Sequence, residues 1–146
     1  MRVLIQRVKR ASVRSGGALL GRIGRGLLVF VGIAEADGPD QVRWMCEKIV
    51  KLRIFEDESG KMNRSVADAV GEILVVSQFT LYGDASRGNR PSFTEAARPE
   101  KAEGIYEETV RLLSELAPIP VATGSFGAEM EVELVNDGPV TILLQR

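Results

Sequence analysis

Histidine is absent from all 146 residues of the chain, and this absence removes several kinds of active site. A Ser-His-Asp or Cys-His nucleophile system depends on an imidazole base that titrates near neutral pH. Zinc sites with histidine ligands are excluded for the same reason. Any chemistry that this chain performs must therefore rely on other groups.

Cysteine is almost as scarce, since Cys46 is the only one. One cysteine forms no internal disulfide and no cysteine-ligated metal centre, so we expect a reducing, cytoplasmic compartment and no metal site. Apolar residues surround Cys46 at helical spacing, which favours an inert core thiol over a catalytic one. The longest apolar run, residues 26–34, is far shorter than the roughly 18 to 20 residues of a membrane span, so we expect a soluble protein.

Charge of one sign is missing from the first 34 residues. They hold seven basic side chains and no acidic one, whereas residues 35–146 hold 12 basic and 20 acidic ones, a net charge of -8. The asymmetry fits either a polyanionic partner that docks on one face or a solvated strand face, and charge alone does not choose between them. The seven are Arg2, Arg7, Lys9, Arg10, Arg14, Arg22 and Arg25.

What is present is the composition of one globular domain over residues 1–146, with 45% hydrophobic and 27% charged residues. Alternating apolar residues predict strands, and apolar residues at helical spacing predict two amphipathic helices. We expect an α/β (α+β) fold in which a mainly antiparallel, barrel-like β-sheet carries two packed helices. The expected strands cover residues 1–10, 18–23, 27–33, 72–79, 128–135 and 140–144, and the expected helices cover residues 40–50 and 99–116.

A dinucleotide-binding fold is disfavoured. The glycine-rich segment at residues 21–26 lies between two expected strands rather than between a strand and a helix, so it predicts a hairpin turn. Two other segments could carry chemistry. Residues 77–84 lead from a strand into a long connection at residues 80–99, and residues 136–141 place Gly138 before Pro139 between two expected strands. Taken singly, each also fits an ordinary turn.

Six blocks of the chain, in order, resemble the D-aminoacyl-tRNA deacylase (D-tyrosyl-tRNA deacylase) family. They are residues 1–8 (MRVLIQRV), 52–65 (LRIFEDESGKMNRS), 77–84 (SQFTLYGD), 87–93 (RGNRPSF), 123–130 (TGSFGAEM) and 136–141 (NDGPVT). Gly83 and Arg87 depart from the alanine and lysine that are common in that family, and the C-terminal LLQR is atypical for it. None of these departures touches the two principal motifs. The resemblance covers essentially the whole chain.

The resemblance implies hydrolysis of the ester that joins a D-amino acid to tRNA, with glycyl-tRNA mischarged on tRNA-Ala as a further substrate. It implies a homodimer with its active site at the dimer interface and no cofactor. In the family, a cis Gly138–Pro139 peptide bond projects into the partner's pocket and rejects L-amino acids, and Arg7 orients this motif. These properties are expectations from the family and not from composition.

The resemblance also implies roles for single residues. Ser77, Gln78, Phe79 and Thr80 match the family's catalytic segment, in which the 2′-hydroxyl of the terminal ribose assists the reaction. Phe126, Met130 and Asn136 match residues that bind substrate and adenosine. Two other classes of function remain open at this point, a non-catalytic module that binds RNA ends and a small dimeric ligand-binding or scaffold protein.

Overall fold

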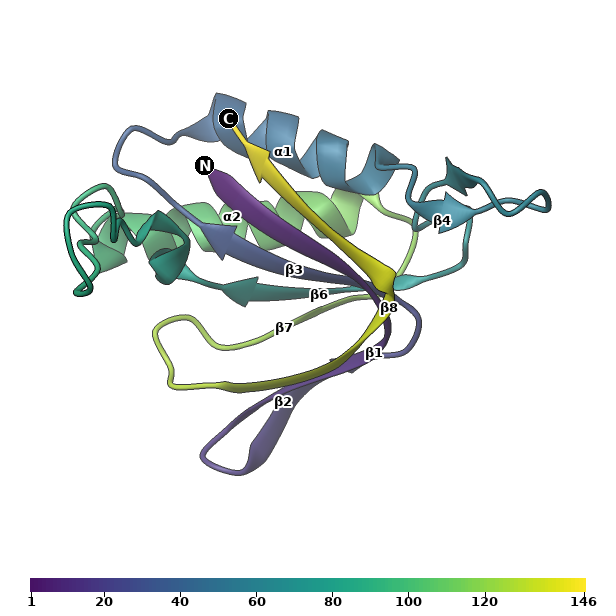
Figure 1. Ribbon diagram of the computed structural model, residues 1–146, viewed down its shortest axis with the longest axis horizontal. Coiled ribbons are helices and arrows are strands. Elements are labelled where there is room, and N and C mark those ends of the chain that lie inside the picture. Colours follow the sequence, from purple (N-terminus) through teal and green to yellow (C-terminus); the bar gives the residue numbers. More distant parts are fainter.

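The strand β1 (Arg2–Ser15) organises the sheet, because it pairs with three other strands. The computed structural model describes residues 1–146. One edge of β1 pairs first with β3 (Gly26–Gly32) and then with β2 (Ala18–Ile23), and its other edge pairs with β8 (Glu131–Gln145) along nearly its full length. Figure 1 shows that β1 and β8 curve together, so that the sheet approaches a closed barrel.

The sheet is mixed rather than purely antiparallel. The pairs that β1 makes are antiparallel, as expected, but β6 (Glu72–Ser77) runs parallel to β3, and β7 (Val121–Thr123) runs parallel to β6. Parallel neighbours need a long crossover connection, which α1 (Pro39–Lys51) and α2 (Pro99–Leu116) provide. The prediction of a barrel-like sheet with two helices is confirmed. The structure refines it by showing that part of the sheet is parallel.

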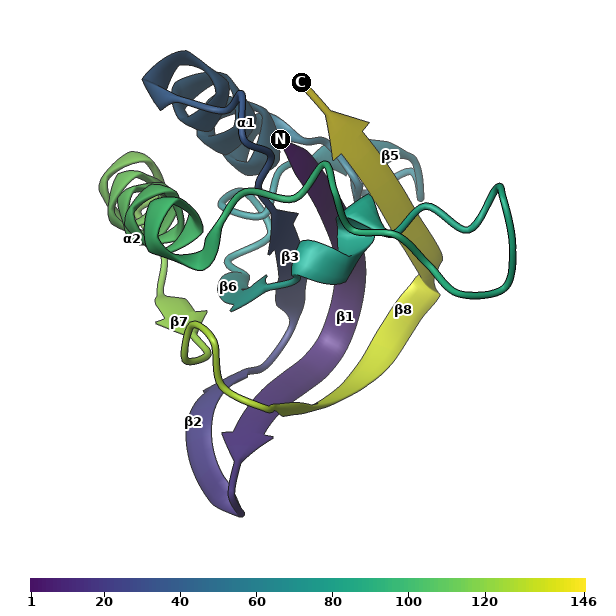
Figure 2. The same ribbon diagram turned by 90° about the vertical axis from the view of Figure 1, so that its left-hand side faces the viewer.

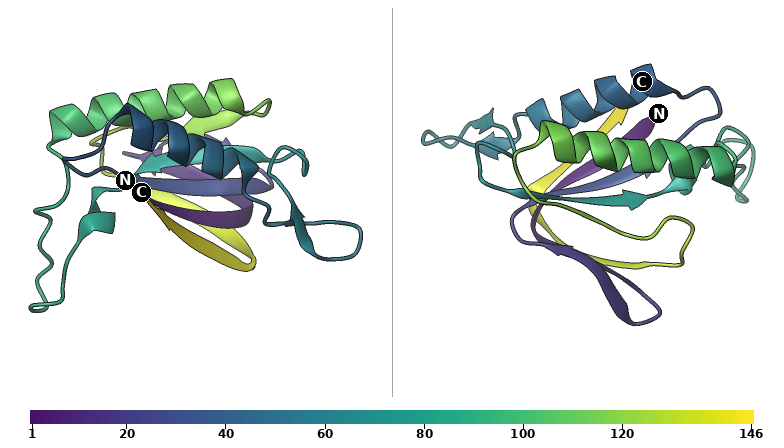
Figure 3. Two further views of the ribbon diagram at one scale, coloured as in Figure 1. Left: turned by 90° about the horizontal axis from the view of Figure 1, so that it is seen from above. Right: turned by 180° about the vertical axis from the view of Figure 1, so that it is seen from behind.

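The two helices lie side by side on one face of the sheet, as the view from above shows (Figure 3). The main core of 22 buried residues lies between the helices and the sheet, and a second cluster of seven fills the barrel side. Cys46 on α1 is fully buried, and its Sγ donates to the main-chain oxygen of Thr109 on α2 at 3.6 Å. Burial raises the pKa of this thiol to about 12, in agreement with an inert core residue.

Two small elements lie at opposite ends of the molecule (Figure 1). A hairpin of β4 (Phe55–Glu56) and β5 (Met62–Arg64) projects beyond α1 at one end, and the 3-10 helix η1 (Phe79–Tyr82) follows β6 at the other. No helix of the structure combines the length and the apolar character of a membrane span.

The expectation of two C-terminal strands joined by a turn is wrong, because β8 is continuous from Glu131 to Gln145. Residues 137–140 form a bulge instead. Gln6 pairs with Thr141 and Val8 pairs with Asn136, so four residues of β8 stand opposite Arg7 alone. The Gly138–Pro139 peptide bond within the bulge is cis. Proline and glycine thus mark a bulge in a paired strand rather than the end of one.

Candidate functional site

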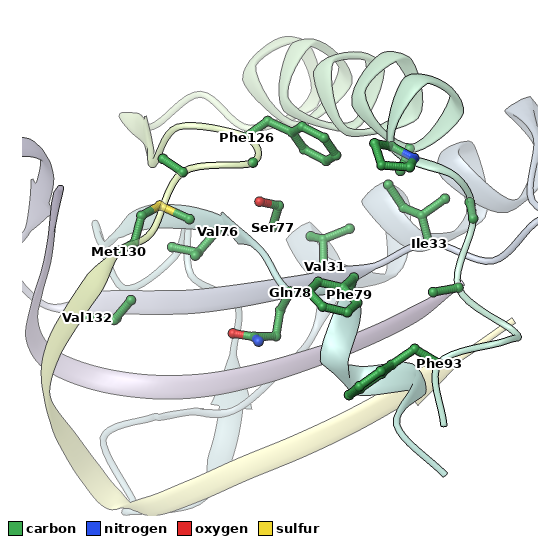
Figure 4. A pocket seen from close by; sticks show the side chains of 16 residues that line it. Val31, Ile33, Val76, Ser77, Gln78, Phe79, Phe93, Phe126, Met130 and Val132 are labelled. Atoms are coloured by element: carbon green, nitrogen blue, oxygen red, sulfur yellow. The ribbon is translucent and has the colours of Figure 1, made fainter. Parts of the chain in front are cut away.

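A cavity of about 550 Å³ opens between the end of the sheet, the N-terminal end of α2 and the loop of residues 124–130 (Figure 4). Twelve of its 16 lining residues are hydrophobic, so a bound molecule meets mainly apolar walls with a few polar groups. The lining residues are Val31, Ile33, Val76, Ser77, Gln78, Phe79, Phe93, Ala96, Ala97, Pro99, Ala102, Phe126, Gly127, Ala128, Met130 and Val132.

The polar edge of the cavity comes from the end of β6. This strand is buried from Ile73 to Val76, which suits a central strand with neighbours on both sides, and the buried run stops at the half-buried Ser77. Gln78 donates its main-chain N–H to Val31 at 2.8 Å and continues the parallel pairing by one step. Ser77, Gln78 and Phe79 therefore line the cavity because β6 ends there, and their catalytic role stays a prediction.

Thr80 does not line the cavity. It is exposed on η1, where its Oγ1 accepts a hydrogen bond from the side chain of Gln78. Phe79 and Thr80 are the first residues of η1, and the main-chain N–H groups at the start of a helix have no acceptor within it. The segment therefore presents main-chain donors, and a side-chain base is not among its contacts.

Phe126 and Met130 form the opposite wall, on the loop that follows β7. The ring of Phe126 packs on Tyr106 with centroids 5.8 Å apart, and the Tyr106 hydroxyl donates to the main-chain oxygen of Val75 at 3.0 Å. Burial raises the pKa of Tyr106 to about 12, so this hydroxyl stays a donor near neutral pH. α2 and β6 thereby fix the position of the aromatic wall.

Asn136 lies away from the cavity, at the base of the bulge. Its Oδ1 accepts from the main-chain N–H of Val140 at 2.9 Å, and its Nδ2 donates to Thr141 Oγ1 at 3.1 Å. These bonds join the two ends of the bulge. Contact between Asn136 and the adenosine therefore stays a prediction, and the observed role of this side chain is to close the bulge.

Arg7 is the buried partner of the bulge and is only 5% exposed. Its Nε donates to the main-chain oxygen of Asp137 at 3.0 Å, and its Nη1 donates to the main-chain oxygen of Ile54 at 2.6 Å. The Asp137 carboxylate lies 3.5 Å from Nε, and the carboxylate of Glu56 lies 4.0 Å from Nη2. One guanidinium thus joins the bulge to the β4–β5 hairpin, while Gly138 and Pro139 stay exposed.

The bulge and the cavity lie apart within one chain. Ser77 pairs with Val31 and Val31 with Val3, whereas the bulge is level with Arg7, four residues farther along β1. At about 3.3 Å per residue and 4.8 Å per strand, the separation is on the order of 15 to 20 Å. No group of three or more His, Cys, Asp or Glu side chains is arranged to hold a metal ion.

Two of the seven basic residues in the first 34 positions are engaged within the chain. Arg7 is buried, and Arg2 donates to the main-chain oxygen of Leu81 at 3.1 Å and stacks over the ring of Tyr82. The other five are exposed, and Arg14 stands opposite Glu131 in the β1–β8 register while its Nη1 donates to the main-chain oxygen of Gly17 at 3.2 Å. Five basic side chains of this segment therefore remain on the surface.

Sequence reasoning missed Phe93, which lines the cavity and contacts the ring of Phe79. Its block, RPSF, was recognised only through the family resemblance. A phenylalanine among the polar residues of a 20-residue connection is the signal that could have drawn attention to it. The partners of Arg7 on the hairpin, Ile54 and Glu56, were also missed, because nothing in the sequence relates them to the bulge.

Comparison with known proteins identifies relatives over the full chain. A family model described as D-Tyr-tRNA(Tyr) deacylase matches residues 4–145. A D-aminoacyl-tRNA deacylase of Chloroherpeton thalassium is 59% identical over 145 residues, which cover 99% of this chain and 95% of the relative. A D-aminoacyl-tRNA deacylase of Thermotoga petrophila is 58% identical over 144 residues, with 99% and 96% covered.

Two solved structures share the fold of this chain. One described as the c-Myc DNA Unwinding Element Binding Protein superposes with a TM-score of 0.95 at 45% identity and covers 100% of this chain and 99% of its own. A probable eukaryotic D-amino acid tRNA deacylase superposes with a TM-score of 0.82 over 98% of this chain and 97% of its own, at 17% identity, which shows a shared fold. The family model and the relatives together show that the chain belongs to the D-Tyr-tRNA(Tyr) deacylase family.

Proposed function

We propose that this protein is a hydrolase that cleaves the ester bond of D-aminoacyl-tRNA and releases free tRNA and the D-amino acid, with residues 1–146 as one deacylase domain. The observation that carries the proposal is the full-length similarity to D-aminoacyl-tRNA deacylases. The cavity supports it, because an apolar pocket edged by main-chain donors suits an aminoacyl-adenosine end. The substrate belongs to translation, so we place the activity in the cytoplasm.

The catalytic proposal assigns the reaction to main-chain groups and to the substrate. Phe79 and Thr80 would direct their N–H groups at the developing oxyanion, and the 2′-hydroxyl of the terminal ribose would assist water. Ser77 and Gln78 would position the ester. Orientation alone can contribute roughly 7 to 11 kcal/mol to a barrier, which makes a nucleophilic side chain unnecessary for a labile ester. The absence of histidine fits this mechanism.

The adenosine would enter the cavity between the polar end of β6 and the wall of Phe126 and Met130. Stacking of a base on an aromatic ring is worth about 1 to 3 kcal/mol, and the flexible methionine thioether beside the ring adapts to the shape of the base. Phe126 is held against Tyr106, so the wall is already ordered before substrate binds.

Two copies of the chain would be needed to complete the site. The exposed Gly138 and Pro139 lie on the order of 15 to 20 Å from the cavity of their own chain, too far to contact a bound substrate. We therefore propose a homodimer in which each bulge enters the partner's cavity. Arg7 would act as a positioning residue, since its two main-chain contacts fix the bulge against the hairpin.

Chiral selection would follow from this arrangement. The carbonyl oxygens of Gly138 and Pro139 would face the substrate α-carbon and leave room for hydrogen but not for an L side chain. Contact with rigid main chain is a repulsive form of specificity, and it rejects a ligand more strongly than a loss of favourable contacts does. Glycine has no side chain, so glycyl-tRNA on tRNA-Ala would also be hydrolysed.

The test is a deacylation assay with D-Tyr-tRNA, its L counterpart, and a D-Tyr-tRNA that ends in 2′-deoxyadenosine. The proposal expects rapid hydrolysis of the D substrate alone and much slower hydrolysis of the deoxy substrate. Binding of tRNA without turnover would indicate a module for RNA ends. Ligand binding that neither requires tRNA nor changes with salt concentration would indicate a ligand-binding or scaffold protein. Hydrolysis of the deoxy substrate at the normal rate would remove the ribose from the mechanism.

A further inference from the structure

We propose that Phe79 and Phe93, together with Arg87 and Arg90, bind the unpaired nucleotides that precede the terminal adenosine of the substrate. We call these four residues the aromatic-basic platform. The inference rests on the proposed function, because it assumes that the terminal adenosine occupies the cavity. It adds a second binding site on the same RNA strand, at the mouth of the cavity.

The aromatic half of the platform lies at the mouth of the cavity. Phe79 is 59% exposed, which is unusual for a phenylalanine. Its ring contacts the ring of Phe93 edge-on, with centroids 5.1 Å apart. Figure 4 shows both rings beside each other, at the end of the cavity away from Met130. Both residues also line the cavity, so a strand that leaves it meets the two rings next.

The local backbone fixes Phe93 in this place. Its ring lies so close to Gly83 that a Cβ at that position would stand 3.0 Å from the Phe93 Cε1 atom. Gly83 ends η1, the helix that carries Phe79. The glycine therefore lets the loop ring pack on η1, and the two aromatic side chains form one unit instead of two independent surface residues.

The basic half of the platform lies on the adjoining loop. Asp84 and Ser92 exchange two main-chain hydrogen bonds of 2.8 Å and so pin the ends of residues 84–92, which project beside η1 (Figure 2). Arg87 and Arg90 lie within this loop, are exposed, and make no ion pair or hydrogen bond with the rest of the chain. Asp84 is the one acidic residue of the loop, which leaves a net charge of +1.

This combination suits single-stranded RNA more than other polyanions. Exposed aromatic rings stack on unpaired bases, and arginines beside them contact the phosphates. A duplex hides its base faces, so it would leave Phe79 and Phe93 without a stacking partner. The strand that enters the cavity is the unpaired 3′ end of tRNA, and its next nucleotides must pass the mouth. The exposed arginines of β1 lack an aromatic neighbour of this kind, and one of them, Arg14, stands opposite Glu131 in the register with β8.

The first test compares substrates of increasing length, namely D-phenylalanyl esters of adenosine, of the dinucleotide CA and of the trinucleotide CCA. For the wild type we expect kcat/KM to rise from adenosine to CCA. Phe93→Leu and the double variant Arg87→Ala/Arg90→Ala should reduce this rise at least about fivefold, a value set by the loss of one stacked base or of phosphate contacts. Phe93→Tyr keeps the ring and should retain the rise.

Two control variants make the result specific. Arg43→Ala removes an exposed charge from α1, remote from the cavity mouth, and should leave the rise unchanged. Arg14→Ala tests the rival surface on β1. If Arg14→Ala lowers the rise and the loop variants do not, the platform is refuted. If the wild type hydrolyses none of the three esters, the proposed function itself fails, which is a different outcome.

A binding measurement gives a readout that is independent of turnover. Fluorescence anisotropy of a labelled ACCA tetranucleotide should give a Kd that rises at least about fivefold for Phe93→Leu, and a weaker salt dependence for the double arginine variant. Equal Kd values for wild type and Phe93→Leu would overturn the proposal. The proposal would also be overturned if Phe93→Leu lost the dimer in sedimentation velocity but kept RNA binding, because the rings would then belong to a subunit interface.

Discussion

Replacement of Gly138 by alanine tests whether the bulge of β8 depends on a main chain that only glycine adopts. Gly138 has φ of +136°, a region that L side chains rarely enter. A Cβ at this position would stand 2.7 Å from Val140 Cγ2, 3.0 Å from the main-chain nitrogen of Val140 and 3.1 Å from Arg7 Nη2. The new methyl group would therefore push on the strand and on the guanidinium that holds the bulge.

The magnitude follows from two contributions. A side chain in a sparsely populated backbone region costs about 1 to 3 kcal/mol, and overpacking against fixed neighbours costs a similar amount. Partial relief through movement of the bulge lowers the sum, so we expect the free energy of unfolding to fall by about 2 to 4 kcal/mol. Movement of the bulge by about 1 Å would lower kcat/KM for D-aminoacyl-tRNA by about 100-fold.

The matched control is Gly60→Ala in the turn of the β4–β5 hairpin. Gly60 also has a positive φ, +75°, but no atom lies within 4 Å of an added Cβ. This variant should lose about 1 to 2 kcal/mol of stability and no activity. Guanidinium unfolding and deacylation kinetics at 25 °C measure both quantities. If Gly138→Ala keeps wild-type kcat/KM, or loses no more than Gly60→Ala, the bulge does not set the active geometry.

Three further predictions concern single residues. Thr80→Ala should lower kcat less than tenfold and trap no acyl-enzyme, because Thr80 is a neighbour of the site rather than a nucleophile; a covalent intermediate in rapid-quench mass spectrometry would contradict this. Asp37→Ala should lower the free energy of unfolding by about 3 to 5 kcal/mol, because the buried Met1 ammonium, 2.6 Å from Asp37 Oδ1, would lose its charged partner. A loss below about 1 kcal/mol in urea unfolding would be inconsistent with that ion pair. Burial raises the pKa values of Cys46 and Tyr106 from their usual 9.0 and 10.0 to about 12, so both groups bind protons more tightly in the folded state. The free energy of unfolding should therefore be full below about pH 9 and fall as pH rises toward 12, with a smaller fall in Cys46→Ala. A free energy of unfolding in urea that stays constant over that pH interval would refute this prediction.

Local pattern predicted most of the elements. The glycine pair at residues 16–17, the alternation in residues 1–10 and the apolar spacing of the helices gave hairpin, strand and helices near their observed places. The sequence did not predict the parallel pairing of β3, β6 and β7, because the direction of neighbouring strands depends on how α1 and α2 cross the sheet and not on the strands themselves.

The candidate site divides in the same way. The sequence indicates why Ser77, Gln78 and Phe79 reach the cavity, because it shows a buried strand that ends in polar residues, and their catalytic role stays a prediction. The sequence predicts a turn at Gly138 where the structure has a bulge, because proline and glycine break the strand pattern in both cases. The contact of Arg7 with Ile54 joins residues 47 positions apart, and local sequence holds no sign of such a pair.

Hydrolysis of matched D- and L-Tyr-tRNA by the purified protein is the decisive measurement of the proposed chiral gate. A gate built from main-chain carbonyls should pass the D substrate and exclude the L substrate, so we expect kcat/KM to differ by at least about a thousandfold, or roughly 4 kcal/mol in transition-state free energy. Cleavage of both substrates at similar rates, or of neither, would contradict it.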